Sequence, residues 1–264
     1  MNKGPYREAK LNSQTDVVSD LREIIEISEK IDQLDLTDSN RRYPSEYCCD
    51  DKYFPDEAWE MLKYTKLKKL DLSSVNQISG EQIRRLENTQ IRKIVLGIKK
   101  ISPEIIDSLN AVKIKFAWFP SVVQIKKNDF GDSSLSGVIR YNGIKNFDND
   151  IFVSFERMGD VVGLPEIRKV SRIAAEKISS LNLKYKDLEL NAPLEFEDDE
   201  CLEIIASARQ GLIRLTGLVI DQNALLKMKE RSGGARVIIR AKDNDGKVFR
   251  GSFGNGQGYP IGFL

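Results

Sequence analysis

The sequence of 264 residues contains no histidine. This absence excludes Ser-His-Asp and Cys-His nucleophile pairs, zinc sites with histidine ligands, and imidazole as a general acid or base. Only three cysteines are present, Cys48, Cys49 and Cys201. Because neighbours in sequence rarely pair with each other and the count is odd, we expect free thiols and a reducing compartment.

Long apolar runs are also missing. No stretch approaches the roughly 18 apolar residues that cross a bilayer, so we expect no membrane span. The first sixteen residues, MNKGPYREAKLNSQTD, contain no apolar segment of the kind that marks a secretory signal peptide. We therefore expect a cytoplasmic protein, or one exported without a classical signal peptide.

The sequence also lacks complete signatures of cofactor and metal sites. The sequence has no GxxxxGK[ST] loop, and Pro260 follows the glycines at 254, 256 and 258 before a helix could begin. Asp243–Gly246 begins like a calcium loop, but Lys247 stands at the third ligand position, so a β-turn between two strands is the better interpretation. We predict no cofactor and no metal site.

Charge is balanced overall but unevenly placed. The net charge is +1, yet residues 62–115 contain twelve basic side chains and five acidic ones, whereas Glu195–Glu203 is strongly acidic. Such asymmetry is typical of a solvated surface, and it can also steer a charged partner. Scattered lysines with a near-neutral total make nucleic-acid binding a weak alternative.

One pattern occurs twice in succession, in Leu67–Leu86 and in Ile91–Leu109. Each copy begins with alternating apolar residues, typical of a short strand, and continues with apolar residues three apart, typical of a short helix. Ser79 and Ser102 stand where helix N-caps are expected, and Pro103 occupies a first-turn position. Each copy therefore predicts a strand, a turn and a helix.

These units resemble the leucine-rich repeat family, most clearly over residues 67–119. The resemblance implies an α/β fold: a solenoid (horseshoe) with a parallel stack of strands, short outer helices, and here an irregular middle segment. It also implies protein binding on the concave strand face, an inference by analogy of fold. Val75 and Lys99 depart from the family at the position usually held by Asn or Cys.

The pattern predicts four parts of the chain. They are an N-terminal helical cap at 1–30, repeat-like units at 31–119 with an insertion at 37–54, an irregular segment with strands and a helix at 120–177, and further repeat-like units with a C-terminal hairpin cap at 178–264. Strands are expected at 31–36, 112–119, 150–158, 178–183, 212–218 and 236–240 among others, and the middle segment is expected to contain an extra hairpin.

Outward positions of the strands provide the candidate binding residues. They are Lys69, Asp71, Lys93, Lys113, Lys115 and Trp118. The lysines form a basic column suited to an acidic protein surface, and tryptophan is enriched at interface hot spots, although Trp118 could equally pack beneath the middle segment.

We therefore expect a protein-recognition module with no catalytic residues, either a cytosolic adaptor or a bacterial effector acting in a host cell. The alternative is an enzyme that uses carboxylate, lysine or cysteine chemistry in the middle segment or at Cys48-Cys49.

Overall fold

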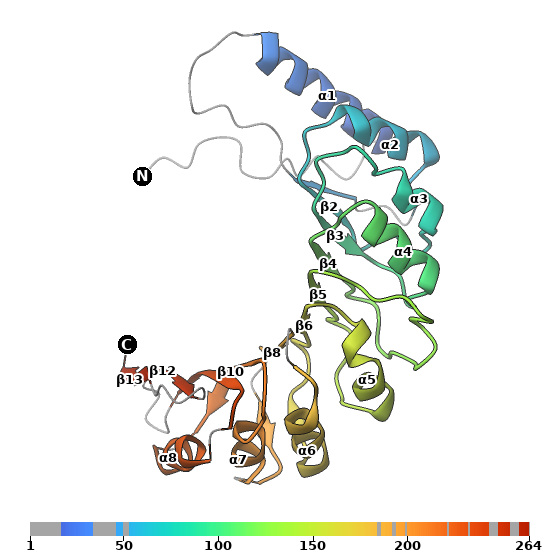
Figure 1. Ribbon diagram of the computed structural model, residues 1–264. Coiled ribbons are helices and arrows are strands. Elements are labelled where there is room, and N and C mark those ends of the chain that lie inside the picture. The colour runs from blue at the N-terminus through green and yellow to red at the C-terminus, as the bar shows by residue number, and fades with distance from the viewer. Residues whose placement is uncertain are drawn as a thin grey trace. The chain divides into compact units, whose positions relative to one another are not determined.

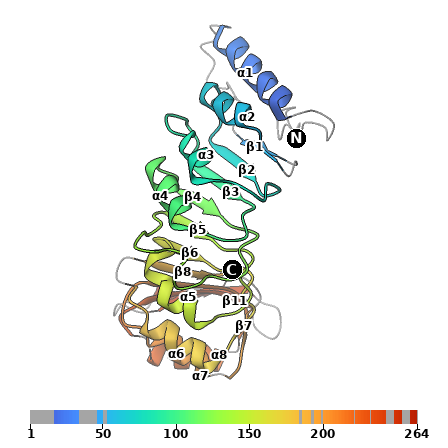
Figure 2. The same cartoon turned by 90° about the vertical axis from the view of Figure 1, so that its right-hand side faces the viewer.

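The computed structural model describes residues 17–33, 46–49, 53–183, 186–191, 194–198, 200–220, 222–231, 233–242, 248–253 and 259–263. The chain divides into two compact units, Met1–Ser121 and Val122–Leu264. Both alternate strands with short helices, so the protein has an α/β fold with mostly parallel strands (Figures 1 and 2). No described helix is long and apolar enough to cross a membrane.

The first unit contains one parallel sheet. Its elements are α1 (Val17–Gln33), β1 (Glu46–Cys48), α2 (Asp56–Met61), the 3₁₀ helix η1 (Leu62–Tyr64), β2 (Lys69–Leu72), α3 (Gly80–Arg84), β3 (Lys93–Leu96), α4 (Pro103–Ala111) and β4 (Phe116–Trp118). The sheet order within this unit is β1-β2-β3-β4, and every pair is parallel. Helices α3 and α4 pack together on one side of these strands (Figure 1).

The two copies of the repeated pattern fold as a strand, a turn and a helix, as predicted. Ser79 Oγ accepts a hydrogen bond from the Gln82 amide, and the Gln82 side chain accepts one in return from the Ser79 amide, which completes a capping box. At α4 the Ser102 hydroxyl accepts a single hydrogen bond from the Ile105 amide, with Pro103 in the first turn. Both predicted N-caps are confirmed.

The first strand lies elsewhere than predicted. Residues 31–33 of the predicted strand at 31–36 are the last residues of α1, and 34–36 lie outside the described part of the chain. Val17, Leu21 and Ile24 are buried along α1 at helical spacing. The strand that pairs with β2 is β1, which falls inside the predicted insertion at 37–54.

The second unit is longer and contains more strands. Its elements are β5 (Val138–Arg140), α5 (Asn149–Ser154), the 3₁₀ helix η2 (Phe155–Arg157), β6 (Val161–Gly163), β7 (Lys169–Val170), α6 (Arg172–Ser180), β8 (Asp187–Leu190), β9 (Glu195–Phe196), α7 (Glu200–Ala206), β10 (Leu212–Val219), α8 (Gln222–Glu230), β11 (Arg236–Lys242), β12 (Val248–Phe253) and β13 (Tyr259–Phe263). Within it the order is β5-β6-β8-β10-β11-β12-β13, parallel from β5 to β11 and antiparallel beyond.

Two strands predicted in this unit are wrong. Residues 150–158 form most of α5 and then η2, because Ile151, Ser154, Phe155 and Met158 are buried at helical spacing and Asp148 caps the first turn. The polar Ser154 interrupts the apolar stripe, so the sequence alone hides the helix. Instead of the expected hairpin, β5 and β6 pair in parallel.

The segment 178–183 is the second error. Residues 178–180 end α6, whose buried Ala174, Ala175 and Ile178 follow a helical period, and the strand comes later as β8. The strands predicted at 212–218 and 236–240 correspond to β10 and β11, and the second of these forms an antiparallel pair with β12. The predicted turn at 243–246 lies outside the described residues.

Candidate functional site

Strand alternation in the first unit directs a set of polar and aromatic side chains to one face of the sheet. In β2, Leu70 and Leu72 are buried, whereas Lys69 and Asp71 are partly exposed. In β4, Ala117 is buried between two half-exposed aromatic residues. Figure 1 shows α2, α3 and α4 on the opposite face. No helix of the described residues covers this face of the strands, so the strand side chains form its surface.

The register aligns four residues in a first row across the sheet. They are Glu46, Lys69, Lys93 and Phe116. The ammonium group of Lys69 lies 3.0 Å from a carboxylate oxygen of Glu46, and that of Lys93 lies 5.3 Å from the centre of the Phe116 ring. A cation over an aromatic ring at this distance contributes on the order of 0.5–1 kcal/mol.

The second row consists of Cys48, Asp71, Val95 and Trp118. Lys69 joins the two rows, since its ammonium group lies 5.7 Å from the centre of the Trp118 ring. Five side chains form a continuous surface, which we call the strand-face cluster: Lys69, Glu46, Lys93, Phe116 and Trp118. A fixed positive charge beside two half-exposed rings provides both apolar area and charge for a partner.

Three of the predicted binding residues belong to this cluster, and two lie elsewhere. Lys69, Lys93 and Trp118 are brought together, whereas Lys113 and Lys115 precede β4. The amides of Lys115 and Phe116 both donate to the Arg92 carbonyl oxygen, at 2.9 and 3.1 Å, so two residues here oppose one. The strand begins at Phe116, which pairs with Lys93, so Phe116 stands in the row and Lys115 lies before it.

Asp71, the remaining predicted residue, has a local role. Its carboxylate accepts a hydrogen bond of 3.0 Å from the Ser73 amide and so fixes the turn that follows β2. Glu46 and Phe116 are members of the cluster that the sequence did not indicate. Alternation from Lys113 through buried Ile114 to Lys115 would bury Phe116. Ala117 is buried instead, and this break in the alternation was the available signal for Phe116.

A second group of charges lies on the strands of the second unit. Arg214 contacts two carboxylates, with its Nη2 3.6 Å from Asp187 and its Nε 3.3 Å from Glu189. Arg140 Nη2 lies 3.6 Å from the other oxygen of Glu189. Burial raises the pKa of Asp187 above its usual value, and the neighbouring Arg214 opposes that rise.

Gly163 makes this arrangement possible. It lies between Arg140 and Glu189 in the register, and a Cβ there would approach Arg140 Cγ to 2.8 Å. The missing side chain leaves room for the arginine to reach Glu189 across β6. The result is a network of paired charges that is half shielded from solvent.

The cysteines named as alternative catalytic groups are placed separately. Cys48 is exposed in β1, Cys49 is buried beside it, and Cys201 is buried in α7. Burial raises the pKa of the Cys201 thiol, the opposite of what activates a nucleophile. Within the described ranges, no group of three or more His, Cys, Asp or Glu side chains is arranged to hold a metal ion.

Burial also lowers the pKa of Lys186, although Asp160 and Glu156 oppose the shift. Its ammonium group donates to the Gly159 carbonyl oxygen at 2.6 Å, which ties the start of β8 to the turn before β6. This contact gives Lys186 a structural role in joining two strands.

Comparison of the chain with protein-family models, with curated proteins and with solved structures finds no significant match.

Proposed function

We propose that the chain is a protein-recognition module of leucine-rich-repeat-like units, and that its strand-face cluster binds an acidic protein surface. The observation that carries the proposal is the cluster itself: Lys69 and Lys93 in register, flanked by the half-exposed rings of Phe116 and Trp118. Aromatic anchors beside cations are common hot spots of protein interfaces.

Recurring backbone contacts support the repeat assignment. The amides of two adjacent residues donate to one carbonyl oxygen before β3, β4 and β6, at Lys68, Arg92 and Gly137 respectively. These three strands thus begin in the same way, although the side chains differ. Such units bury their apolar faces only against neighbours, which favours a solenoid in the manner of leucine-rich repeats.

Charge balance defines the expected partner. Glu46 neutralises part of the Lys69 charge, while Lys93 is exposed and, among the described residues, contacts only the Phe116 ring. A carboxylate of a partner can displace water from Lys93 and form an ion pair with it. An aromatic or aliphatic group of the same partner can pack on Trp118. Electrostatic complementarity of this kind raises the association rate and selects partners by charge.

The test is quantitative affinity capture from bacterial and from eukaryotic lysates, read by mass spectrometry. The Lys69→Glu, Lys93→Glu double variant is compared with wild type and with Lys99→Glu, Lys100→Glu, which changes the net charge equally in the turn between β3 and α4. We expect a partner that the control retains and the cluster variant loses.

Equal retention by both variants would contradict the proposal. A partner captured from the bacterial lysate favours an adaptor over an effector that acts in a host cell.

A further inference from the structure

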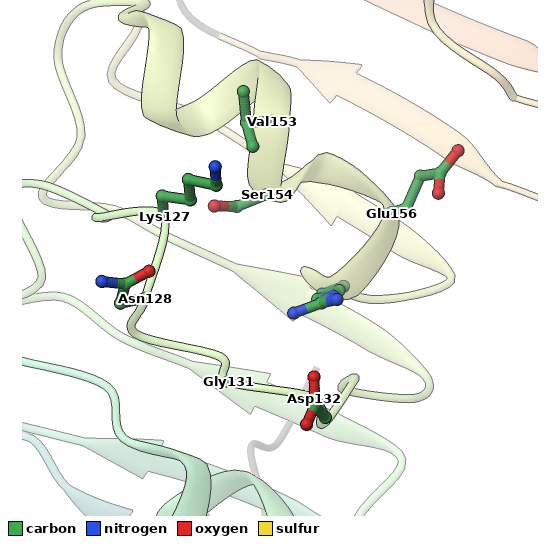
Figure 3. Close-up of a pocket in the computed structure, with 8 residues that line it drawn as sticks. Lys127, Asn128, Gly131, Asp132, Val153, Ser154 and Glu156 are labelled. Carbon is green, nitrogen blue, oxygen red and sulfur yellow. The ribbon is translucent and has the colours of Figure 1, made fainter.

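A cavity of about 440 Å³ lies in the second unit, between the loop that precedes β5 and the helices α5 and η2 (Figure 3). It is lined by Lys127, Asn128, Gly131, Asp132, Val153, Ser154, Glu156 and Arg157. This volume is within the range of sites that hold small molecules. None of these residues belongs to the strand-face cluster.

Ser154 is the unusual member of the lining. The residue is 2% exposed, and its hydroxyl oxygen is buried without a hydrogen-bond partner. A buried hydroxyl without a partner is costly, and native proteins retain few of them without a reason. Figure 3 shows the Ser154 and Lys127 side chains pointing toward each other, so a ligand atom between them would meet a hydroxyl donor and an ammonium group.

Hydrogen bonds hold the backbone of the loop that carries Lys127 and Asn128. The Asp129 carboxylate accepts a hydrogen bond of 2.8 Å from the Lys126 amide, and the Gly131 amide donates to the Asn128 carbonyl oxygen. The Leu135 amide donates to the Arg157 carbonyl oxygen at 2.9 Å, which ties this loop to η2. A preorganised loop reduces the entropy lost on binding.

Three of the four charged side chains in the lining are not engaged in ion pairs of the described residues. Lys127, Arg157 and Asp132 form no side-chain ion pair with any other residue that the structure describes. Glu156 accepts a hydrogen bond from Asn182, and its carboxylate points away from Lys127 and Ser154 in Figure 3. The donors Lys127, Asn128, Ser154 and Arg157 therefore outnumber the one free carboxylate, Asp132.

We propose that this cavity binds the oxyanion of a small metabolite, a phosphate or carboxylate group, through Lys127, Ser154, Asn128 and Arg157. The exposed Val153 beside the cations offers an apolar surface for the carbon part of the ligand. Asp132 opposes the anion and so limits affinity. This site is independent of the proposed recognition of proteins, since the two share no residue.

The test is an NMR titration of the full chain with inorganic phosphate and, separately, with acetate, at ionic strength held constant with chloride. We expect saturable shifts confined to the amides of residues 127–132 and 153–157. Whichever probe binds more tightly identifies the ligand group as phosphate or carboxylate. Shifts that do not saturate with either probe would overturn the proposal.

Variants separate a built site from general charge attraction. Lys127→Ala and Ser154→Ala should each weaken binding about tenfold, as expected for a lost hydrogen bond to a charged group. Asp132→Asn should strengthen binding, because it removes the opposing charge. Lys145→Ala, an exposed lysine outside the cavity, serves as the matched control and should leave affinity within about twofold.

Ser154→Ala is the decisive variant because it removes a polar atom that the fold does not use. It should raise the melting temperature of the free protein and weaken binding of the anion. Unchanged affinity in this variant, or equal loss in Lys145→Ala, would overturn the proposal.

Discussion

Burial divides the three cysteines into two kinds of group. Cys48 is exposed on β1, whereas Cys49 and Cys201 are buried. Thiol chemistry at this protein is therefore restricted to Cys48 unless the fold opens. The odd count led us to predict thiols rather than disulfides, and Cys48, Cys49 and Cys201 form no disulfide among the described residues. Which of the three is accessible depended on long-range packing that the sequence did not display.

The buried thiol of Cys201 makes stability depend on pH. Burial raises its pKa above the usual value of 9.0 in the folded protein. As pH rises above 9.0, the unfolded chain loses this proton first, so the stability that the neutral thiol contributes at lower pH is lost. The free energy of unfolding of wild type should therefore fall relative to Cys201→Ala between pH 8 and pH 10, measured by chemical denaturation.

Leu202→Ala is the control for this comparison. Leu202 is a buried neighbour in α7 that does not titrate, so its difference from wild type should stay constant over the same pH range. A constant difference for Cys201→Ala would show that the thiol does not change its protonation between the two states.

Single elements were predictable where local chemistry was complete. The caps at Ser79 and Ser102 could be identified because the side chain, the spacing and the apolar stripe all agreed. The helix α5 was missed because Ser154 takes a core position and Val153, an apolar residue, is 58% exposed. Both residues line the proposed anion site.

The turns after the strands depend on close backbone contact. Gly97 follows β3, and its amide donates to the Leu72 carbonyl oxygen at 3.0 Å. A Cβ at Gly97 would overlap the carbonyl oxygen of Ser73, which is backbone and cannot rotate away. We predict that Gly97→Ala costs about 3 kcal/mol of unfolding free energy, measured by urea denaturation.

Lys99→Ala in the same turn provides the comparison. Its exposed side chain should change stability by less than about 0.5 kcal/mol. If Gly97→Ala were equally mild, successive turns would have room that the structure does not show.

For the whole molecule, the period of the apolar residues was enough to predict an α/β fold with parallel strands. It was not enough to predict register, because β4 begins at Phe116, which pairs with Lys93 one residue after the expected outward position Lys115. That shift replaced Lys115 by Phe116 in the candidate site. The candidate site also includes Glu46 of β1. This strand pairs with β2 across more than twenty residues of sequence, so a local pattern could not predict the contact.

The central claim is that the strand-face cluster is a recognition surface, and Trp118 reports on it directly. The chain has two tryptophans, and Trp59 is fully buried, so a Trp59→Phe variant leaves Trp118 as the only indole. The measurement is acrylamide quenching of Trp118 fluorescence with and without the partner identified by capture. We predict that saturating partner reduces quenching toward that of a buried tryptophan. Unchanged quenching in a saturated complex would contradict the account.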